Sequence, residues 1–152
     1  MVQGNITYRK ATEKDIPLLI DLIREMADYE KLLDEVSIES DVLADQLFIK
    51  KRAEAIILEL NDSPIGYQIY FYNFSTFMGR SGLYVEDIYL KHDYRGRGFG
   101  TEVFDYLEQL AREEGCGRME WACLDWNENA RKFYQRFGAS PMDDWSIFRK
   151  TL

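Results

Sequence analysis

The sequence predicts an α/β (α+β) fold in which a mixed, mostly antiparallel sheet is flanked by helices. Strand-like and helix-like stretches follow one another in the order β-α-α-β-β-β-α-β-α-β. Short turns join the strands in the middle, as in antiparallel hairpins, and a strand–helix–strand crossover joins residues 83–123. The 152 residues contain no repeat or low-complexity linker. We therefore expect one domain that buries roughly 70% of its unfolded surface.

The first half of the chain predicts one strand, two helices and a hairpin. Residues 6–11 alternate like a short strand, and Thr12 is a candidate cap for a helix that runs to about Tyr29. Apolar residues recur along that helix at helical spacing, which predicts one buried stripe. The other elements expected here are a short helix at 40–47 and two strands, at 53–60 and 65–74, joined by an Asn-Asp-Ser-Pro turn.

The second half predicts three strands and two helices. One helix follows a glycine-rich stretch and ends at Gly115, and the other has Asn127 as a candidate N-cap and Gly138 as a stop signal. The expected strands lie at 82–90, 118–124 and 145–152, and the last of them closes the sheet.

The charge balance bears on the kind of ligand. The chain has 27 acidic and 19 basic side chains, for a net charge of −8. Binding of nucleic acid is disfavoured, because it requires clustered lysine and arginine. An acidic surface attracts cationic ligands. In many proteins, however, an acidic surface serves only solubility.

Membrane, secretion and metal signals are weak. No run of about 18 apolar residues suggests a membrane span, and the N-terminus has no apolar signal-peptide core. Cys116 and Cys123 are too few and too oddly spaced for a zinc site or a disulfide framework. We expect a cytoplasmic protein with no bound metal, and neither nucleic acid nor membrane as partner.

Residues 95–100 read RGRGFG, directly before a predicted helix. No lysine follows for a Walker A loop, and the glycines alternate as G-x-G-x-G rather than G-x-G-x-x-G, so both nucleotide motifs are excluded. A helix N-terminus with bare backbone and nearby arginines still suits a phosphate or pyrophosphate. A flexible strand-to-helix turn is the alternative interpretation.

The same six residues fit the R/Q-x-x-G-x-G/A signature of the GNAT superfamily of acetyl-CoA-dependent N-acyltransferases. Three blocks, at 9–30, 84–100 and 125–140, resemble the diamine (spermidine/spermine) and thialysine N-acetyltransferase family over nearly the full length. The resemblance implies a single GNAT domain over residues 1–152, a homodimer, and a twisted sheet with a splayed central strand pair.

The resemblance also implies acetyl-CoA as cosubstrate, bound where the strand 84–90 splays from the strand 118–124. Backbone groups of the first strand would pair with the pantetheine arm as an added strand would, and amides of the glycine-rich stretch would take the pyrophosphate. The implied cofactor-binding residues are Ile88, Tyr89, Leu90, Arg95, Gly96, Arg97, Gly98, Phe99, Gly100, Thr101, Asn127 and Ala130.

Two catalytic residues are candidates. An amine with a pKa of about 10.4 arrives as ammonium, and the departing thiolate benefits from a proton. The resemblance implies that Tyr134 is the acid and that Glu86, acting through water, is the base. Tyr134 could instead be a core aromatic, and Glu86 with Asp87 a structural salt bridge. Adjacent strand residues face opposite sides, so both carboxylates serve one site only if the strand bulges or the site wraps the strand edge.

The implied substrate is a small cationic amine. Polyamine-acetylating members carry an acidic residue and a tryptophan where this chain has Ser75 and Phe77, so a short diamine or a thialysine-like amino acid becomes at least as good a candidate as a long polyamine. Acetylation of a protein N-terminus or lysine, and a non-catalytic CoA-binding module, are the alternative functions. The substrate-binding candidates are Tyr29, Glu30, Glu86, Asp87 and Asp144.

Overall fold

The structure, a computed structural model, describes residues 4–152. It divides into two compact units, Met1–Trp121 and Ala122–Leu152. The first contains the whole sheet, and each unit is described by itself below. No helix in the described part of the chain is long and apolar enough to cross a membrane.

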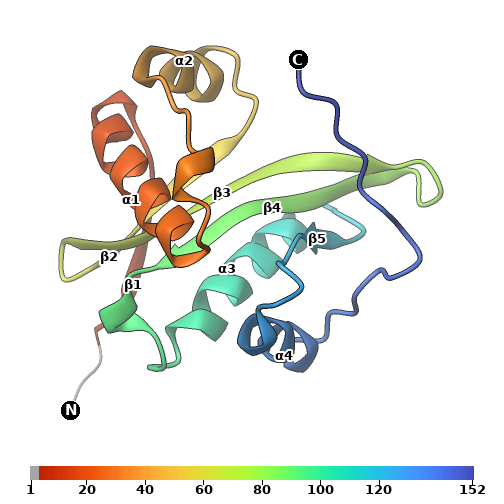
Figure 1. Ribbon diagram of the computed structural model, residues 1–152. Helices are drawn as coiled ribbons and strands as arrows, with labels where there is room; N and C mark the ends of the chain where they lie inside the picture. The colour runs from red at the N-terminus through yellow and green to blue at the C-terminus, as the bar shows by residue number, and fades with distance from the viewer. Residues whose placement is uncertain (1–3) are drawn as a thin grey trace. The chain divides into compact units, whose positions relative to one another are not determined.

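A five-stranded sheet organises the first unit, with its strands in the order β1-β2-β3-β4-β5 (Figure 1). The first four strands pair antiparallel, and β5 pairs parallel to β4. This arrangement confirms the predicted mixed, mostly antiparallel sheet. The strands are β1 (Ile6–Lys10), β2 (Glu54–Leu60), β3 (Ser63–Ser75), β4 (Arg80–Leu90) and β5 (Met119–Trp121).

Helices cover both faces of this sheet. Helix α1 packs its apolar stripe onto the core around Ile57 and Tyr67, while α3 lies on the opposite side in Figure 1. The Gln68 side chain of β3 donates from Nε2 to the Val103 carbonyl of α3 at 2.8 Å. The helices of this unit are α1 (Ile16–Tyr29), α2 (Ser40–Ala44), a π-helical turn (Asp45–Ile49), α3 (Phe99–Glu113) and 3-10 turns at Glu13–Asp15, Leu33–Glu35 and His92–Tyr94.

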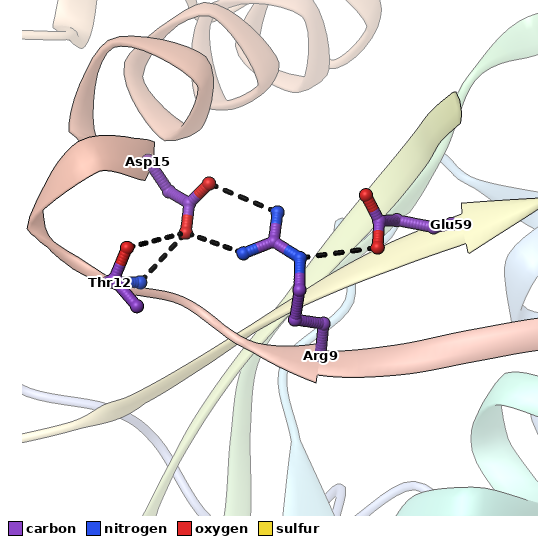
Figure 2. A network of polar contacts seen from close by, with 4 residues as sticks. All are labelled: Arg9, Thr12, Asp15 and Glu59. Atoms are coloured by element: carbon purple, nitrogen blue, oxygen red, sulfur yellow. Dashed lines mark hydrogen bonds and ion pairs between the residues drawn. The ribbon is translucent and has the colours of Figure 1, made fainter. Parts of the chain in front are cut away.

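A polar network fixes the start of α1, as Figure 2 shows. Both guanidinium Nη atoms of Arg9 donate to the Asp15 carboxylate, at 2.8 and 3.0 Å, and Arg9 Nε donates to Glu59 on β2 at 3.2 Å. Asp15 also accepts from the backbone N–H of Thr12 at 2.8 Å. Thr12 is the N-cap residue of the 3-10 turn that leads into α1, as predicted, and it forms a capping box with Asp15.

The second unit contains α4 (Glu128–Arg136). Asn127 caps it, because its Oδ1 accepts from the Ala130 N–H at 3.2 Å. Gly138 adopts a φ of +101°, and the next amide, of Ala139, donates back to the Tyr134 carbonyl at 3.0 Å. The predicted cap and stop of this helix are both confirmed.

Two expected strands differ from the structure. Residues 145–152 form no strand, because a strand requires a hydrogen-bonded partner and residues 122–152 contain no other strand with which to pair. The strand expected at 118–124 is reduced to β5. It pairs only with Leu83–Val85 and ends where β4 departs from regular pairing, at Glu86.

Candidate active site

Strand β4 bulges at Glu86. Its pairing with β3 aligns Val85 with Tyr70. The next aligned pair is Asp87 with Ile69, so Glu86 is an extra residue without a partner on β3. Directly opposite residues of an antiparallel pair share a face, which puts Asp87 on the core side beneath α1, where Ile69 packs. The bulge that would let both carboxylates serve one site is present.

Asp87 is held by a buried tyrosine. The Tyr67 hydroxyl donates to Asp87 Oδ2 at 2.8 Å and lies 3.4 Å from Met26 Sδ. Tyr67 is fully buried, at 0% exposure. Burial raises the pKa of Asp87 to about 6, although the Tyr67 hydrogen bond lowers it. Asp87 is therefore an anion at neutral pH in a place where water solvates it poorly.

Two further carboxylates surround it. Glu30, directly after the last residue of α1, and Glu86 both raise the pKa of Asp87 by charge repulsion, and burial raises the pKa of Glu30 itself. Within residues 4–121, none of the three carboxylates forms an ion pair. The structural salt bridge considered for Glu86 and Asp87 is thus not seen in this unit. Mutually repelling carboxylates, of which Glu30 and Asp87 are partly buried, with no cation between them are typical of a binding site.

Arg95 connects this region to the glycine-rich loop. Its guanidinium carbon lies 4.3 Å from the ring centroid of Tyr29 and 5.4 Å from that of Tyr89. Arg95 Nε donates to the Leu90 carbonyl at 2.9 Å, and the Arg95 amide donates to the His92 carbonyl at 3.2 Å. The Arg95 side chain therefore ties the loop to the end of α1 and to the end of β4.

The loop itself uses glycine for two reasons. Gly96 and Gly98 have φ angles of +71° and +84°, which L side chains rarely adopt. A Cβ at either position would meet no heavy atom within 4 Å, so the backbone there faces open space. The bond from the Glu102 amide to the Gly98 carbonyl, at 3.4 Å, begins α3. The amides of Phe99, Gly100 and Thr101 in that first turn have no intrahelical acceptor.

This open backbone has the features expected of a phosphate-binding site. Arg97 is in the same loop and donates to the Asp93 carbonyl at 3.4 Å, with its guanidinium 5.5 Å from the Tyr94 ring and 5.4 Å from the Phe99 ring. Open glycines, a helix N-terminus and a nearby cation are the combination that binds phosphate groups.

The end of β4 is also suited to an extended ligand. β5 pairs with β4 only up to Val85, so Ile88, Tyr89 and Leu90 have no strand on that side among residues 4–121. On the other side β3 comes unusually close: a Cβ on Gly66 would lie 1.9 Å from the Tyr89 carbonyl oxygen. Gly66 therefore permits the close approach of β3 to β4 at the predicted pantetheine position.

The remaining predicted residues belong to the second unit. Asn127 and Ala130 are joined by the N-cap bond of α4. Tyr134, one helical turn further along, packs against Phe133 with ring centroids 5.8 Å apart. Asp144 lies in the turn closed by the bond from the Trp145 amide to the Met142 carbonyl, at 3.2 Å.

Sequence reasoning missed Tyr67 and Gly66. The alternation of β3 puts Tyr67 on the core face, and a buried tyrosine needs a hydrogen-bond partner for its hydroxyl. That signal indicates that the Tyr67 hydroxyl has a hydrogen-bond partner. It does not identify Asp87 as that partner, because the register of β3 with β4 cannot be read from one sequence. Gly66 carries no signal beyond being a glycine inside a strand.

The sequence is similar to those of known acetyltransferases. The sequence model of the acetyltransferase (GNAT) family matches residues 19–139. The thialysine N-epsilon-acetyltransferase of Bos taurus is 35% identical over an alignment of 156 residues, covering 95% of this chain and 91% of that protein. The L-ornithine N5-acetyltransferase NATA1 of Arabidopsis thaliana is 28% identical and covers 94% and 83%. The resemblance drawn from the three sequence blocks is confirmed.

The fold is confirmed independently by solved structures. The ribosomal-protein-alanine N-acetyltransferase from Brucella melitensis biovar Abortus 2308 superimposes with a TM-score of 0.75 at 22% identity, covering 97% of this chain and 99% of that one. At this identity the likeness concerns the fold alone.

Proposed function

Since the chain belongs to the GNAT family and is an acyl-CoA-dependent N-acetyltransferase, we propose that it transfers the acetyl group of acetyl-CoA directly to a primary amine of a small cationic molecule. The proposal treats residues 1–152 as one GNAT domain that functions as a homodimer. Measurement of the native mass by light scattering tests the dimer.

The glycine-rich loop supports the choice of donor. Amides from Gly96 to Thr101 would bind the pyrophosphate, and the free side of β4 at 88–90 would pair with the pantetheine arm. Arg95 contributes charge and rigidity rather than a free amide, because its N–H already donates to His92. Acetyl-CoA supplies the activated acetyl group, and these residues orient it.

The carboxylate cluster supports a cationic acceptor, and this is the observation that carries the proposal. Asp87, Glu30 and Glu86 gather without an ion-pair partner in the first unit. A substrate ammonium would relieve their mutual repulsion. Glu86, exposed at the bulge, would take the proton from the ammonium through a water molecule, and Tyr29 would line the same site at the end of α1.

Tyr134 is the proposed general acid. A phenol with a pKa of about 10 is protonated at neutral pH and donates to a leaving thiolate. Asn127, the N-cap of α4, and Ala130, one turn before Tyr134, would contribute to the binding of CoA. Their helix is well defined at its start by the Asn127 cap, which gives Tyr134 a rigid support.

The preferred amine is proposed to be compact. Ser75 is buried, and its hydroxyl accepts from the Met78 amide at 3.2 Å inside the turn between β3 and β4, while Phe77 at the tip is fully exposed. Neither position supplies an anion for the far end of a long polyamine. The thialysine and ornithine acetyltransferases among the relatives are named for short diamino acids. An amino acid with a side-chain amine is therefore the first substrate to test.

An acceptor panel tests the proposal. Release of free CoA would be followed with thialysine, ornithine, lysine, putrescine, spermidine, spermine and a peptide with a free N-terminus. We expect the highest kcat/KM for a diamino acid or a short diamine. Preference for the peptide would favour protein acetylation instead, and binding of acetyl-CoA without any acceptor turnover would favour a non-catalytic CoA-binding module.

A further inference from the structure

We infer that Tyr67 is a positioning residue for the amine: its hydroxyl fixes Asp87 through Oδ2 and leaves Oδ1 to receive the substrate ammonium. This inference rests on the proposed function, since it assigns the way in which that site holds its cationic acceptor. Tyr67 itself does not touch the substrate.

The two oxygens of Asp87 differ in their surroundings. Oδ2 accepts the 2.8 Å hydrogen bond from Tyr67. Oδ1 makes no hydrogen bond to the described residues. It is also not one of the fully buried side-chain polar atoms that have no hydrogen-bond partner. An ionised carboxylate accepts through both oxygens. One oxygen is therefore anchored, and the other is open to an incoming donor.

Tyr67 can act only as a donor in this pair. Burial, and then the charge of Asp87, raise the pKa of Tyr67 far above its ordinary value, so the phenol keeps its proton. Its hydroxyl has two acceptors within reach, Asp87 Oδ2 and, at 3.4 Å, Met26 Sδ. Donation to Asp87 favours the ionised carboxylate, which is the form that binds an ammonium group. Protonation of Asp87 would leave Met26 as the remaining acceptor.

The surrounding groups select a cation. Glu86, next to Asp87 on β4, and Glu30, directly after α1, both disfavour the ionised Asp87. Besides Asp87, the ionisable groups that act on Tyr67 are Glu30 and Tyr89. The nearby cation, Arg95, is engaged with the rings of Tyr29 and Tyr89 and with the Leu90 carbonyl. An ammonium ligand at Oδ1 would neutralise a site that its own neighbours make electrostatically unfavourable.

The Tyr67→Phe variant tests the inference with a conservative change. We expect the KM for the amine to rise about tenfold, the size of one hydrogen bond to a charged group, while kcat and the KM for acetyl-CoA change less than about twofold. The acidic limb of the pH profile of kcat/KM for the amine should move to higher pH, because the bond that favours ionised Asp87 is lost. Tyr70→Phe, on the same strand but the opposite face, is the matched control and should shift neither quantity.

A double-mutant cycle separates positioning from packing. In an Asp87→Asn background, the inference predicts that Tyr67→Phe adds less than about twofold to the KM of the amine. A purely structural role for Tyr67 predicts instead the same penalty in both backgrounds, together with an unchanged pH profile, and that result would overturn the inference.

A measurement without substrate distinguishes failure of this inference from failure of the proposed function. The carboxyl carbon of Asp87, labelled with ¹³C, is titrated by NMR in the wild-type chain and in Tyr67→Phe. A higher Asp87 pKa in the variant supports the inference even if no amine in the panel is acetylated, and an unchanged pKa refutes it even if every amine is. If Tyr67→Phe does not fold, Tyr67 is replaced by 3-fluorotyrosine, whose hydroxyl is a stronger hydrogen-bond donor. This replacement must shift the Asp87 titration to lower pH, and the absence of a shift refutes the inference.

Discussion

The glycine-rich loop and the carboxylate cluster build their sites in opposite ways. The loop at 95–101 uses consecutive backbone groups, and its glycines are required by positive φ angles at Gly96 and Gly98. The carboxylate cluster uses side chains from the end of α1, from β3 and from the bulge of β4. Damage to the loop should therefore cost both folding and donor binding. Damage to the cluster should cost acceptor binding and, at Glu86, proton transfer as well, and should relieve electrostatic repulsion.

The largest expected effect lies outside both regions. Because Tyr134 is the proposed general acid of the chemical step, Tyr134→Phe should lower kcat on the order of 100-fold or more while both KM values stay near wild type. Steady-state kinetics with acetyl-CoA and the best amine of the panel measure this. Tyr106→Phe, on α3, serves as the control. Unchanged turnover in Tyr134→Phe would remove this residue from the acid role.

Gly98→Val tests the glycine-rich loop. A β-branched residue at a φ of +84° is strained, and its side chain would occupy the open space assigned to pyrophosphate. We expect kcat/KM for acetyl-CoA to fall about 30-fold or more, as several phosphate contacts are lost together. S-acetyl-pantetheine, a donor without the pyrophosphate, should be used equally well by variant and wild type. Equal losses with both donors would instead indicate a general disturbance of the fold.

Asp87→Asn removes one charge from the carboxylate cluster, and we expect the variant to be more stable than the wild type. Because the folded pKa of about 6 lies above the unfolded value of about 3.9, the folded state binds the proton more tightly, so wild-type stability falls as pH rises from about 4 to 6 and the penalty is complete above that. Asp87→Asn should raise the free energy of unfolding at pH 7.5 by about 1–3 kcal/mol and abolish this pH dependence, while the KM of the amine rises.

Denaturant unfolding at pH 4.5 and 7.5 checks this prediction. The difference between the two proteins should be largest at the higher pH and much smaller at the lower one. A loss of stability in Asp87→Asn at pH 7.5 would mean that Asp87 supports the fold rather than a ligand.

Arg95→Met tests the connection between the two regions. The change removes the stacking on Tyr29 and Tyr89 and the bond to the Leu90 carbonyl. We expect both KM values, for acetyl-CoA and for the amine, to rise about three- to fivefold, since each site loses one support of roughly 1 kcal/mol. Arg97→Met, in the same loop, should raise only the KM for acetyl-CoA. An effect of Arg95→Met confined to one substrate would show that the two sites are independent.

The smallest effect is expected far from both sites, at Asp15. The Arg9 guanidinium holds the pKa of Asp15 below its usual value. Its stabilisation is therefore complete above the unfolded pKa of about 3.9 and is lost as pH falls through the lower folded pKa. Asp15→Asn should cost about 1 kcal/mol at pH 7 after allowance for solvent screening, and the difference from wild type should begin to shrink only below about pH 4 and vanish once the pH is below the lowered folded pKa. Both KM values should be unchanged.

The sequence by itself determined the features that are local along the chain. Hydrophobic periodicity over a few turns, or a cap and a stop, is enough to define a helix, so α1, α3 and α4 were predicted at nearly their observed positions. The glycine-rich loop was recognisable because its function resides in consecutive backbone groups. The family followed from three blocks whose spacing along the chain needs no tertiary structure to be read.

Tertiary structure alone decided what depends on pairing between distant residues. The bulge at Glu86, the hydrogen bond from Tyr67 to Asp87 and the close approach of Gly66 to the Tyr89 carbonyl all follow from the register of β3 against β4. Register is a property of two strands, set by how both pack on a common core. For the same reason residues 145–152, which were predicted to close the sheet, form no strand in a unit that offers them no partner strand.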